Sequence, residues 1–182
     1  ILNLKIFTDY LFKNVENGYV VNCIYTDIKK AFDRINIPLL INKLNNLGIC
    51  NPILSWINSY LTGRLQRVKI SNNRSCFIEV TSGVPQGSHI GPLLFLVFIN
   101  DVNSVFKHCR FLLFADDLKL FCRIRNSTDV ILLQEDLGKF VEWCDSNKLE
   151  LNIEKCKAIR FSSKKLLDPP TYFIKDRKLE TT

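Results

Sequence analysis

Two adjacent carboxylates interrupt an apolar segment in the second half of the chain. Asp116 and Asp117 stand at the centre of FLLFADDLKLFC, residues 111–122, whose other residues are mostly apolar or aromatic. Strands disfavour Asp, and an ionised carboxylate in a dry environment is costly unless a cation compensates its charge. A polar turn between two strands would also carry such a doublet, because Asp is common at turns. Taken alone, the doublet leaves both interpretations open.

The elements that must position these carboxylates follow from hydrophobic spacing and from Gly, Pro and Asn signals. We predict helices over residues 1–15, from Pro38 to Gly48, from Pro52 to Leu61, over 92–105, and from Ser127, as N-cap, to Cys144. Strands are predicted over residues 19–25, 110–115, 118–122 and 149–161, with a hairpin of 66–70 and 76–80 and a last extended piece at 172–174. The segment SSKKLLDPP is a predicted connector.

The order of these elements predicts an α+β fold. Without the insertion between Cys50 and Val80, the order is strand, helix, strand, strand, helix, strand. This is the split βαβ arrangement, an antiparallel sheet with helices on one face. In that topology the end of the first strand, near Asp27, lies beside the Asp116-Asp117 turn of the central hairpin. Three carboxylates that are distant in sequence would then meet.

Three clustered carboxylates repel one another, so they need protons, a basic partner or a divalent metal ion. Ligands that are all oxygen favour Mg²⁺ or Mn²⁺ over zinc. Two such ions about 4 Å apart can serve phosphoryl transfer. The predicted cluster therefore indicates a two-metal site.

Composition narrows the class of protein. The chain has 182 residues, enough for one sizeable core, and a net charge of +7, which favours a polyanionic partner, nucleic acid before anionic membrane. No segment reaches the roughly 20 apolar residues that cross a bilayer, so we expect no membrane span. Seven widely spaced Cys without a C-x-x-C pair indicate reduced thiols in an intracellular protein. The absence of Met, even at position 1, suggests a piece of a longer polypeptide.

Four motifs in a fixed order carry a family resemblance. They are YTDIKKAFDRI at 25–35, SGVPQGSHIGPLLF at 82–95, FADDLKLF at 114–121 and WCDSNKLELNIEKCKAIRF at 143–161. Together they resemble the palm motifs of reverse transcriptases. With INDV at 99–102 and the helix that contains LQEDLGKFVEWC, the chain resembles the polymerases of jockey-like non-LTR retrotransposons.

The resemblance implies roles for the carboxylates. Asp27 and Asp116 would be the principal metal-binding groups, Asp117 would complete the catalytic triad, and Ile28 would offer its backbone carbonyl to a metal ion. The family uses two Mg²⁺ or Mn²⁺ ions.

Two further charged residues receive different roles from the resemblance. Lys155 fits the family's late lysine, a catalytic candidate for protonating the departing pyrophosphate or neutralising its charge; a solvated surface lysine is the alternative. We expect Lys155 and Lys157 to share one face of a strand. Asp33 corresponds to a noncatalytic position, and we expect a structural or helix-start role for it.

The resemblance also implies a nucleotide site. Backbone N–H groups around Lys30 and Ala31 would face the triphosphate. Phe32 would stand against the sugar and exclude a 2′-hydroxyl, which predicts dNTP selection; one more core aromatic is the alternative. Gln86 and Gly87 of the VPQGS loop would lie near the nucleotide or template, since glycine permits close approach of the backbone.

The implied function is that of an RNA-directed DNA polymerase that extends the 3′-hydroxyl of a DNA primer with dNTPs on an RNA template. The family implies target-primed synthesis, hence a nuclear site of action. We interpret residues 1–182 as a reverse transcriptase palm core with a partial fingers insertion, lacking the upstream fingers and the downstream thumb. The rest of a polyprotein, with or without an endonuclease, would supply those parts, so we expect the isolated chain to be poorly active.

Two other functions remain open at this point. One is a noncatalytic RNA-binding remnant of a decayed or domesticated element. The other is a different palm polymerase, such as a viral RNA replicase or an intron-encoded maturase. FADD together with Phe32 favours the use of deoxynucleotides over the use of ribonucleotides.

Overall fold

The computed structural model describes residues 2–163 and 169–181. The chain divides into two compact units, where length alone predicted one. We call Ile1–Lys29 with Val102–Thr182 the sheet unit, and Lys30–Asp101 the helical unit. Part of the predicted connector SSKKLLDPP, residues 164–168, lies outside the described residues.

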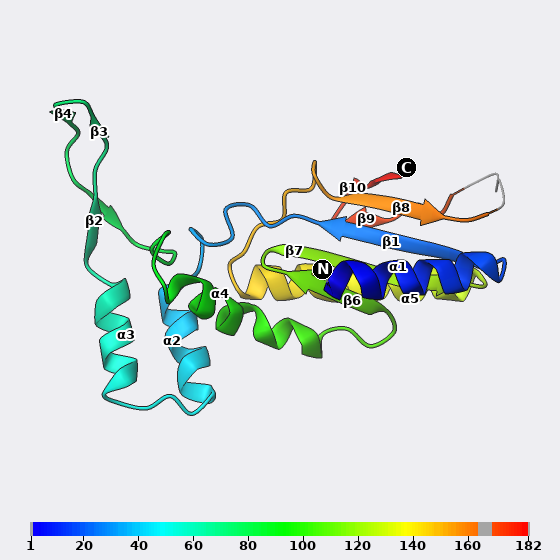
Figure 1. Cartoon of the computed structure of the whole chain (residues 1–182), viewed down its shortest axis with the longest axis horizontal. Coiled ribbons are helices and arrows are strands. Elements are labelled where there is room, and N and C mark those ends of the chain that lie inside the picture. Colours follow the sequence, from blue (N-terminus) through cyan, green and yellow to red (C-terminus); the bar gives the residue numbers. More distant parts are fainter. Residues whose placement is uncertain (1, 164–168, 182) are drawn as a thin grey trace. The chain divides into compact units, whose positions relative to one another are not determined.

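The sheet unit is built on five strands in the order β11-β8-β1-β7-β6 (Figure 1). Their bounds are β1 Val20–Thr26, β6 Arg110–Phe114, β7 Asp117–Ile124, β8 Lys157–Phe161 and β11 Glu180–Thr181. β11 pairs with β8 in parallel, and the other neighbours are antiparallel. The predicted continuous strand over 149–161 is wrong in its middle: residues 152–156 form a turn, and β8 begins only at Lys157.

Helices α1 (Leu2–Glu16) and α5 (Ser127–Ser146) cover opposite faces of this sheet (Figure 1). Phe7 of α1 packs on Cys23 and Phe121, which are cross-strand neighbours. Since side chains alternate along a strand, the next pair, Ile24 and Leu120, is buried on the face that α5 covers. The predicted α+β palm with an antiparallel sheet is confirmed. The prediction that the helices lie on one face of the sheet is wrong. Helix α1, which precedes the split βαβ unit in the chain, packs on the face opposite to α5.

Two carboxylates organise the start of α5 and the segment before β6. Asn126, rather than the predicted Ser127, is the N-cap of α5: its side chain accepts a hydrogen bond from the Asp129 N–H at 3.2 Å. Asp136 of α5 is fully buried and accepts hydrogen bonds from the N–H groups of three consecutive residues, Lys107, His108 and Cys109. It fixes the chain directly before β6. Beyond the sheet, β9 (Phe173–Ile174) and β10 (Arg177–Lys178) form a short hairpin.

The helical unit contains α2 (Ile37–Asn46), α3 (Ile53–Leu61) and α4 (Gly91–Ile99), close to the predicted ranges. A 3₁₀ helix, Asn100–Ser104, follows α4 where we predicted a continuous helix to residue 105. The predicted hairpin is present as two short ladders, β2 (Arg64–Gln66) with β5 (Ile78–Val80) and β3 (Lys69–Ile70) with β4 (Asn73–Arg74). In the part of the chain that the structure describes, no helix has the length and apolarity needed to span a bilayer.

Candidate active site

The three predicted metal-binding aspartates, Asp27, Asp116 and Asp117, lie at one end of two neighbouring strands. In the β1–β7 ladder Thr26 is opposite Leu118, so the next position along each strand brings Asp27 opposite Asp117. Thr26 and Leu118 are buried on the α5 face, and alternation therefore directs Asp27 and Asp117 to the α1 face of the sheet.

Asp116 lies in the turn that joins β6 to β7. Phe114 pairs with Asp117, which leaves Ala115 and Asp116 as a two-residue loop, with Ala115 at a φ of 52°. Positive φ values are usual in such hairpin loops. We expected both aspartates in the turn, but Asp117 is the first residue of β7, because the strand pairing extends to it.

The side chains of the three aspartates differ in exposure. Asp27 and Asp116 are half-buried, whereas Asp117 is exposed. Within the described residues no group of three His, Cys, Asp or Glu side chains is arranged to hold a metal ion. The register thus brings the three residues to one edge, and their side chains are not gathered into a cluster there.

A second segment fixes the chain at Asp27. The Asp27 carbonyl accepts a hydrogen bond from the Asn152 N–H, and the Lys29 N–H donates to the Glu150 carbonyl, both at 2.8 Å. Between these bonds Ile28 is opposite Leu151 in an isolated bridge. Since antiparallel bonding alternates along a strand, the carbonyl of Ile28 points away from Leu151, toward the edge of β1 that pairs with β7.

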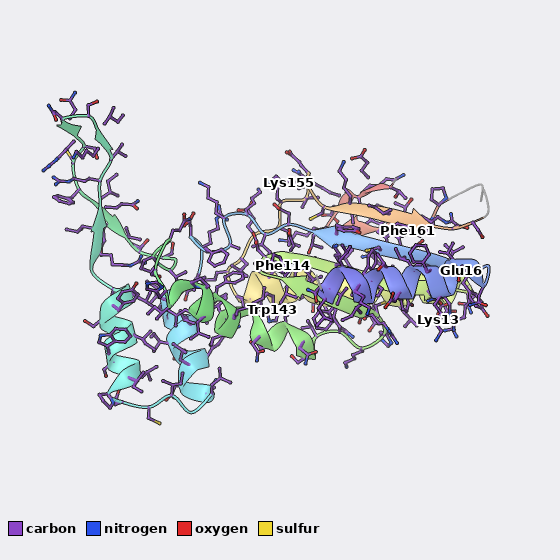
Figure 2. All side chains as sticks on the ribbon, viewed as in Figure 1. Lys13, Glu16, Phe114, Trp143, Lys155 and Phe161 are labelled. Atoms are coloured by element: carbon purple, nitrogen blue, oxygen red, sulfur yellow. The ribbon has the colours of Figure 1, made fainter. Side chains whose placement is uncertain are left out.

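Lys155 forms an ion pair with Asp27. Its Nζ lies 3.8 Å from Oδ2 of Asp27, and its side chain is 67% exposed. The prediction that Lys155 and Lys157 share a strand face is wrong. Lys155 lies in the turn before β8, while Lys157 is in β8 and pairs with Glu180 at 2.9 Å. Figure 2 shows Lys155 and Phe114 toward the same end of the sheet unit.

The predicted nucleotide-binding residues belong to the helical unit. Phe32 is half-buried and stacks on the buried Phe95, with ring centroids 4.2 Å apart and planes at 21°. The Ala31 side chain is buried, and Lys30 has a φ of 48°. In the described part of the chain neither the Lys30 nor the Ala31 N–H donates a hydrogen bond. The pair therefore forms a turn with two unused backbone donors.

The loop that contains Gln86 and Gly87 packs on the segment after Phe32. The Val84 N–H donates to the Phe32 carbonyl at 3.0 Å, and the Gln86 amide donates to the Asp33 carboxylate at 2.8 Å. Gly87 has a φ of 78°. The helical unit thus brings Phe32 and the VPQG loop together by backbone hydrogen bonds.

Sequence reasoning missed the residues that hold Asp27 in place. Glu150 also forms an ion pair with Lys29, and Asn152 donates its N–H to Asp27. The alternation in LELN, residues 149–152, was a signal for an extended segment. Its partner could not be found, because the pairing joins positions more than 120 residues apart.

A five-stranded, mostly antiparallel sheet in which the β6–β7 hairpin and the neighbouring strand β1 end in aspartates is the architecture of a polymerase palm. Comparison with known families agrees. The chain belongs to the reverse transcriptase (RNA-dependent DNA polymerase) family, whose profile matches residues 9–176.

Curated relatives support the same assignment. The chain is 31% identical over 157 residues to the probable RNA-directed DNA polymerase from transposon X-element of Drosophila melanogaster, covering 83% of this chain and 17% of that protein. It is 32% identical over 155 residues to the RNA-directed DNA polymerase from mobile element jockey of Drosophila funebris, covering 80% and 16%. The resemblance to jockey-like elements is confirmed. The chain spans less than a fifth of the length of these relatives.

Solved structures show the same fold. Telomerase from Candida tropicalis, bound to a fragment of telomeric RNA, aligns with a TM-score of 0.66 at 15% identity, covering 89% of this chain and 29% of that one. Telomerase from Candida albicans aligns with a TM-score of 0.65 at 17% identity, covering 100% and 32%. At these identities the likeness concerns the fold alone.

Proposed function

We propose that the chain is the catalytic palm of an RNA-directed DNA polymerase of a mobile element, which extends a primer 3′-hydroxyl with dNTPs on an RNA template. The observation that carries the proposal is the register of β1 and β7, which brings Asp27 opposite Asp117 with Asp116 in the adjoining turn.

The chemistry of the donors at this edge fits two Mg²⁺ or Mn²⁺ ions. Asp27 and Asp116 would bind them, with Asp117 and the carbonyl of Ile28 as further oxygen donors, and hard divalent cations prefer oxygen ligands. Two such ions activate an attacking hydroxyl and stabilise a leaving oxygen. The half-buried positions of Asp27 and Asp116 would reduce competition from bulk water for the same ions.

Lys155 contributes charge at the same place. Its ammonium group, next to the Asp27 carboxylate, offsets part of the repulsion among the aspartates. Because the side chain is largely exposed and long, it can turn toward a departing pyrophosphate and neutralise or protonate it.

The helical unit would bind the incoming nucleotide. The unused N–H groups of Lys30 and Ala31 suit triphosphate oxygens. Stacking on Phe95 restrains the ring plane of Phe32, and a restrained ring can act as a steric barrier to a 2′-hydroxyl. Gln86 and Gly87, held next to Phe32 by the loop, would contact the nucleotide or the template.

The relatives are several times longer than this chain, and we propose that it works within such a polyprotein, with fingers, thumb and in some cases an endonuclease. RNA template and DNA primer would be its macromolecular partners. Target-primed synthesis would place it in the nucleus.

Single-nucleotide incorporation tests the proposal. The purified chain is mixed with a labelled DNA primer annealed to RNA, dNTPs and Mg²⁺ or Mn²⁺. We expect slow extension that falls by at least about 10³-fold in Asp116→Asn, because metal-binding carboxylates stabilise the transition state. Asp33→Asn is the matched control and should keep the wild-type rate, since the introduced amide retains an oxygen that accepts from Gln86.

A readout other than activity distinguishes an inactive fragment from a noncatalytic remnant. Mn²⁺ binding is measured by the loss of the electron paramagnetic resonance signal of the free ion. Binding should weaken in Asp27→Asn and Asp116→Asn and persist in Asp33→Asn. RNA binding without Mn²⁺ binding or nucleotide incorporation would overturn the proposal in favour of the remnant.

A further inference from the structure

A hollow of about 820 Å³ opens in the sheet unit away from the aspartates. We call it the basic hollow. Its lining comes from α1, from the chain before β6, from the far end of β7 and from the first turns of α5. Arg123 lies six residues along β7 from Asp117, which corresponds to about 20 Å of strand. Figure 2 shows Lys13, which lines the hollow, at the opposite end of α1 from Phe114 and Lys155.

Four cations in this lining lack an acidic partner. Lys13, Lys107, Arg110 and Arg123 take part in no ion pair between residues that the structure describes. Asp9 is the acid of the lining that remains to offset them. The first three of these cations are exposed, so their charge is available to a ligand.

Arg125 and Asp129, which also line the hollow, neutralise each other's charge. The Arg125 guanidinium contacts the Asp129 carboxylate through two nitrogens at 3.1 Å. This guanidinium, with backbone N–H groups, holds the pKa of Asp129 below its usual value, so the pair stays charged and compensated near neutral pH. The four unpaired cations therefore dominate the field inside the hollow.

Both arginines are positioned by aromatic rings. The Arg110 guanidinium lies over Tyr10 of α1, 5.0 Å from the ring centroid, and that of Arg123 lies over Tyr19 at 4.6 Å. A guanidinium held over a ring by cation–π attraction keeps N–H groups available for an oxyanion, and the ordering of the side chain costs less on binding. The arrangement suits phosphate oxygens.

We propose that the basic hollow binds the phosphodiester backbone of a nucleic-acid strand, as a second site distinct from the aspartate edge. The four cations come from α1, from the segment before β6, from β6 and from β7, and this spread fits a series of regularly spaced charges better than a single small anion. Nucleic acids supply such a series, and release of their counterions favours contact with several Lys and Arg. Binding at this site does not depend on catalysis.

The test measures RNA affinity without turnover. Polarisation of a fluorescein-labelled 20-nucleotide single-stranded RNA is titrated with the full chain carrying Asp116→Asn, in EDTA, between 50 and 200 mM KCl. In the double variant Lys13→Glu with Lys107→Glu we expect affinity to fall by about tenfold or more at 50 mM KCl. The slope of log affinity against log salt should become shallower by about 1.4, which is about 0.7 for each phosphate of a single strand that the variant no longer neutralises.

The control changes the same net charge elsewhere. Lys5→Glu with Lys178→Glu alters two exposed lysines outside the hollow, one of them on α1 itself, and should lower affinity less than threefold. Lysine acetylation mapped by mass spectrometry, with and without RNA, needs no variant. RNA should protect Lys13 and Lys107 and leave Lys5 and Lys178 reactive.

Equal losses in the two double variants, or equal protection of all four lysines, would overturn the assignment, because the RNA would then sense net charge alone. Poly-glutamate that displaces the RNA at equal charge concentration would also overturn it, in favour of an acidic protein partner. A single-stranded DNA of the same sequence should bind with similar affinity, because the proposed contacts are to phosphates.

Discussion

The two units of this chain place their functional residues by different means. The sheet unit carries Asp27, Asp116 and Asp117 at or next to the ends of strands that are anchored by fully buried residues, such as Ile24, Leu118 and Leu120. The helical unit carries its predicted nucleotide-binding residues on turns and a loop. Its hairpin exposes large apolar side chains, with Leu65 at 61% and Ile70 at 72%.

This difference indicates which functional residues the fold holds rigidly and which it leaves mobile. Metal-ion chemistry requires carboxylates held to within fractions of an ångström, and paired strands over a packed core provide that precision. Substrates must enter and leave, and loops held by a few backbone hydrogen bonds permit this. Trp143 in the sheet unit and Trp56 in the helical unit are the two tryptophans of the chain, so each unit has its own fluorescent reporter.

The largest expected difference between the units is in alkaline solution. Burial raises the pKa of Cys23, Cys144 and Tyr172 in the sheet unit to about 12. The folded unit therefore holds more protons than the unfolded chain from about pH 9 to 12, and its free energy of unfolding falls as pH rises through this range. In the helical unit burial lowers the pKa of Lys43, so its contribution has the opposite sign. Raising the pH relieves the cost of burying that charge.

Urea unfolding at pH 8 and pH 11 measures this contrast. The variant Trp56→Phe reports the sheet unit through Trp143, and Trp143→Phe reports the helical unit through Trp56. We expect the Trp143 midpoint to fall steeply with pH and the Trp56 midpoint to change little. A parallel fall of both midpoints would mean that the buried thiols and phenols do not distinguish the units.

Removal of the buried Asp136 carboxylate should be the next largest effect. Its oxygens accept three backbone N–H groups at 2.8 to 3.1 Å, and Asp136→Ala leaves all three without their acceptor. We expect a loss of roughly 4 kcal/mol in the unfolding free energy of the sheet unit. Asp136→Asn keeps one acceptor oxygen and should lose roughly half as much.

The Trp143 signal in urea measures the Asp136 variants, with Asp176→Ala as an exposed control that should stay within about 0.5 kcal/mol of wild type. A loss below about 1 kcal/mol in Asp136→Ala would show that water replaces the carboxylate, and that this part of the sheet unit is less dry than its burial suggests.

In the helical unit the most sensitive position is a close backbone contact. Gly83 has a φ of 77°, and a Cβ there would lie 2.6 Å from the Asp33 carbonyl oxygen. Gly83→Ala should therefore cost roughly 3 kcal/mol, through strain and overlap together. Gly63→Ala is the matched control: its φ is 65° but a Cβ would meet nothing within 4 Å, so strain alone costs about 1 kcal/mol. Equal shifts of the Trp56 midpoint would contradict the proposed packing of the VPQG loop on Asp33.

Local features of both units were predictable from sequence, because they depend on neighbours along the chain. The helices α1, α2, α3 and α5 follow from apolar residues at helical spacing and from Pro and Gly near their ends. The strands β1, β6 and β7 follow from short apolar runs. The four ordered motifs indicated the family before any geometry was known.

Features that depend on long-range pairing were not predictable. The place of Asp117 in β7 instead of the turn depends on where the β6–β7 ladder closes. The backbone hydrogen bonds of Glu150 with Lys29 and of Asn152 with Asp27 join residues that are far apart in sequence. The buried role of Asp136 was hidden, since an acidic residue on a helix is ordinarily expected to face solvent until its partners in the loop before β6 are known.

The smallest expected effects come from the helix N-caps, and they should be equal in the two units. Asn126 caps α5 in the sheet unit, and Asn36 caps α2 in the helical unit by accepting from the Leu39 N–H at 3.1 Å. Each Asn→Ala change removes one capping hydrogen bond and should cost about 1 kcal/mol in its own unit. Ser127→Ala and Asn42→Ala, which remove no capping side chain, should cost nothing measurable. If Ser127→Ala lowered the free energy of unfolding more than Asn126→Ala, the N-cap would be Ser127, as predicted from sequence, and not Asn126. Equal costs in the two units, read from Trp143 and Trp56, would show that the helix caps do not distinguish the units.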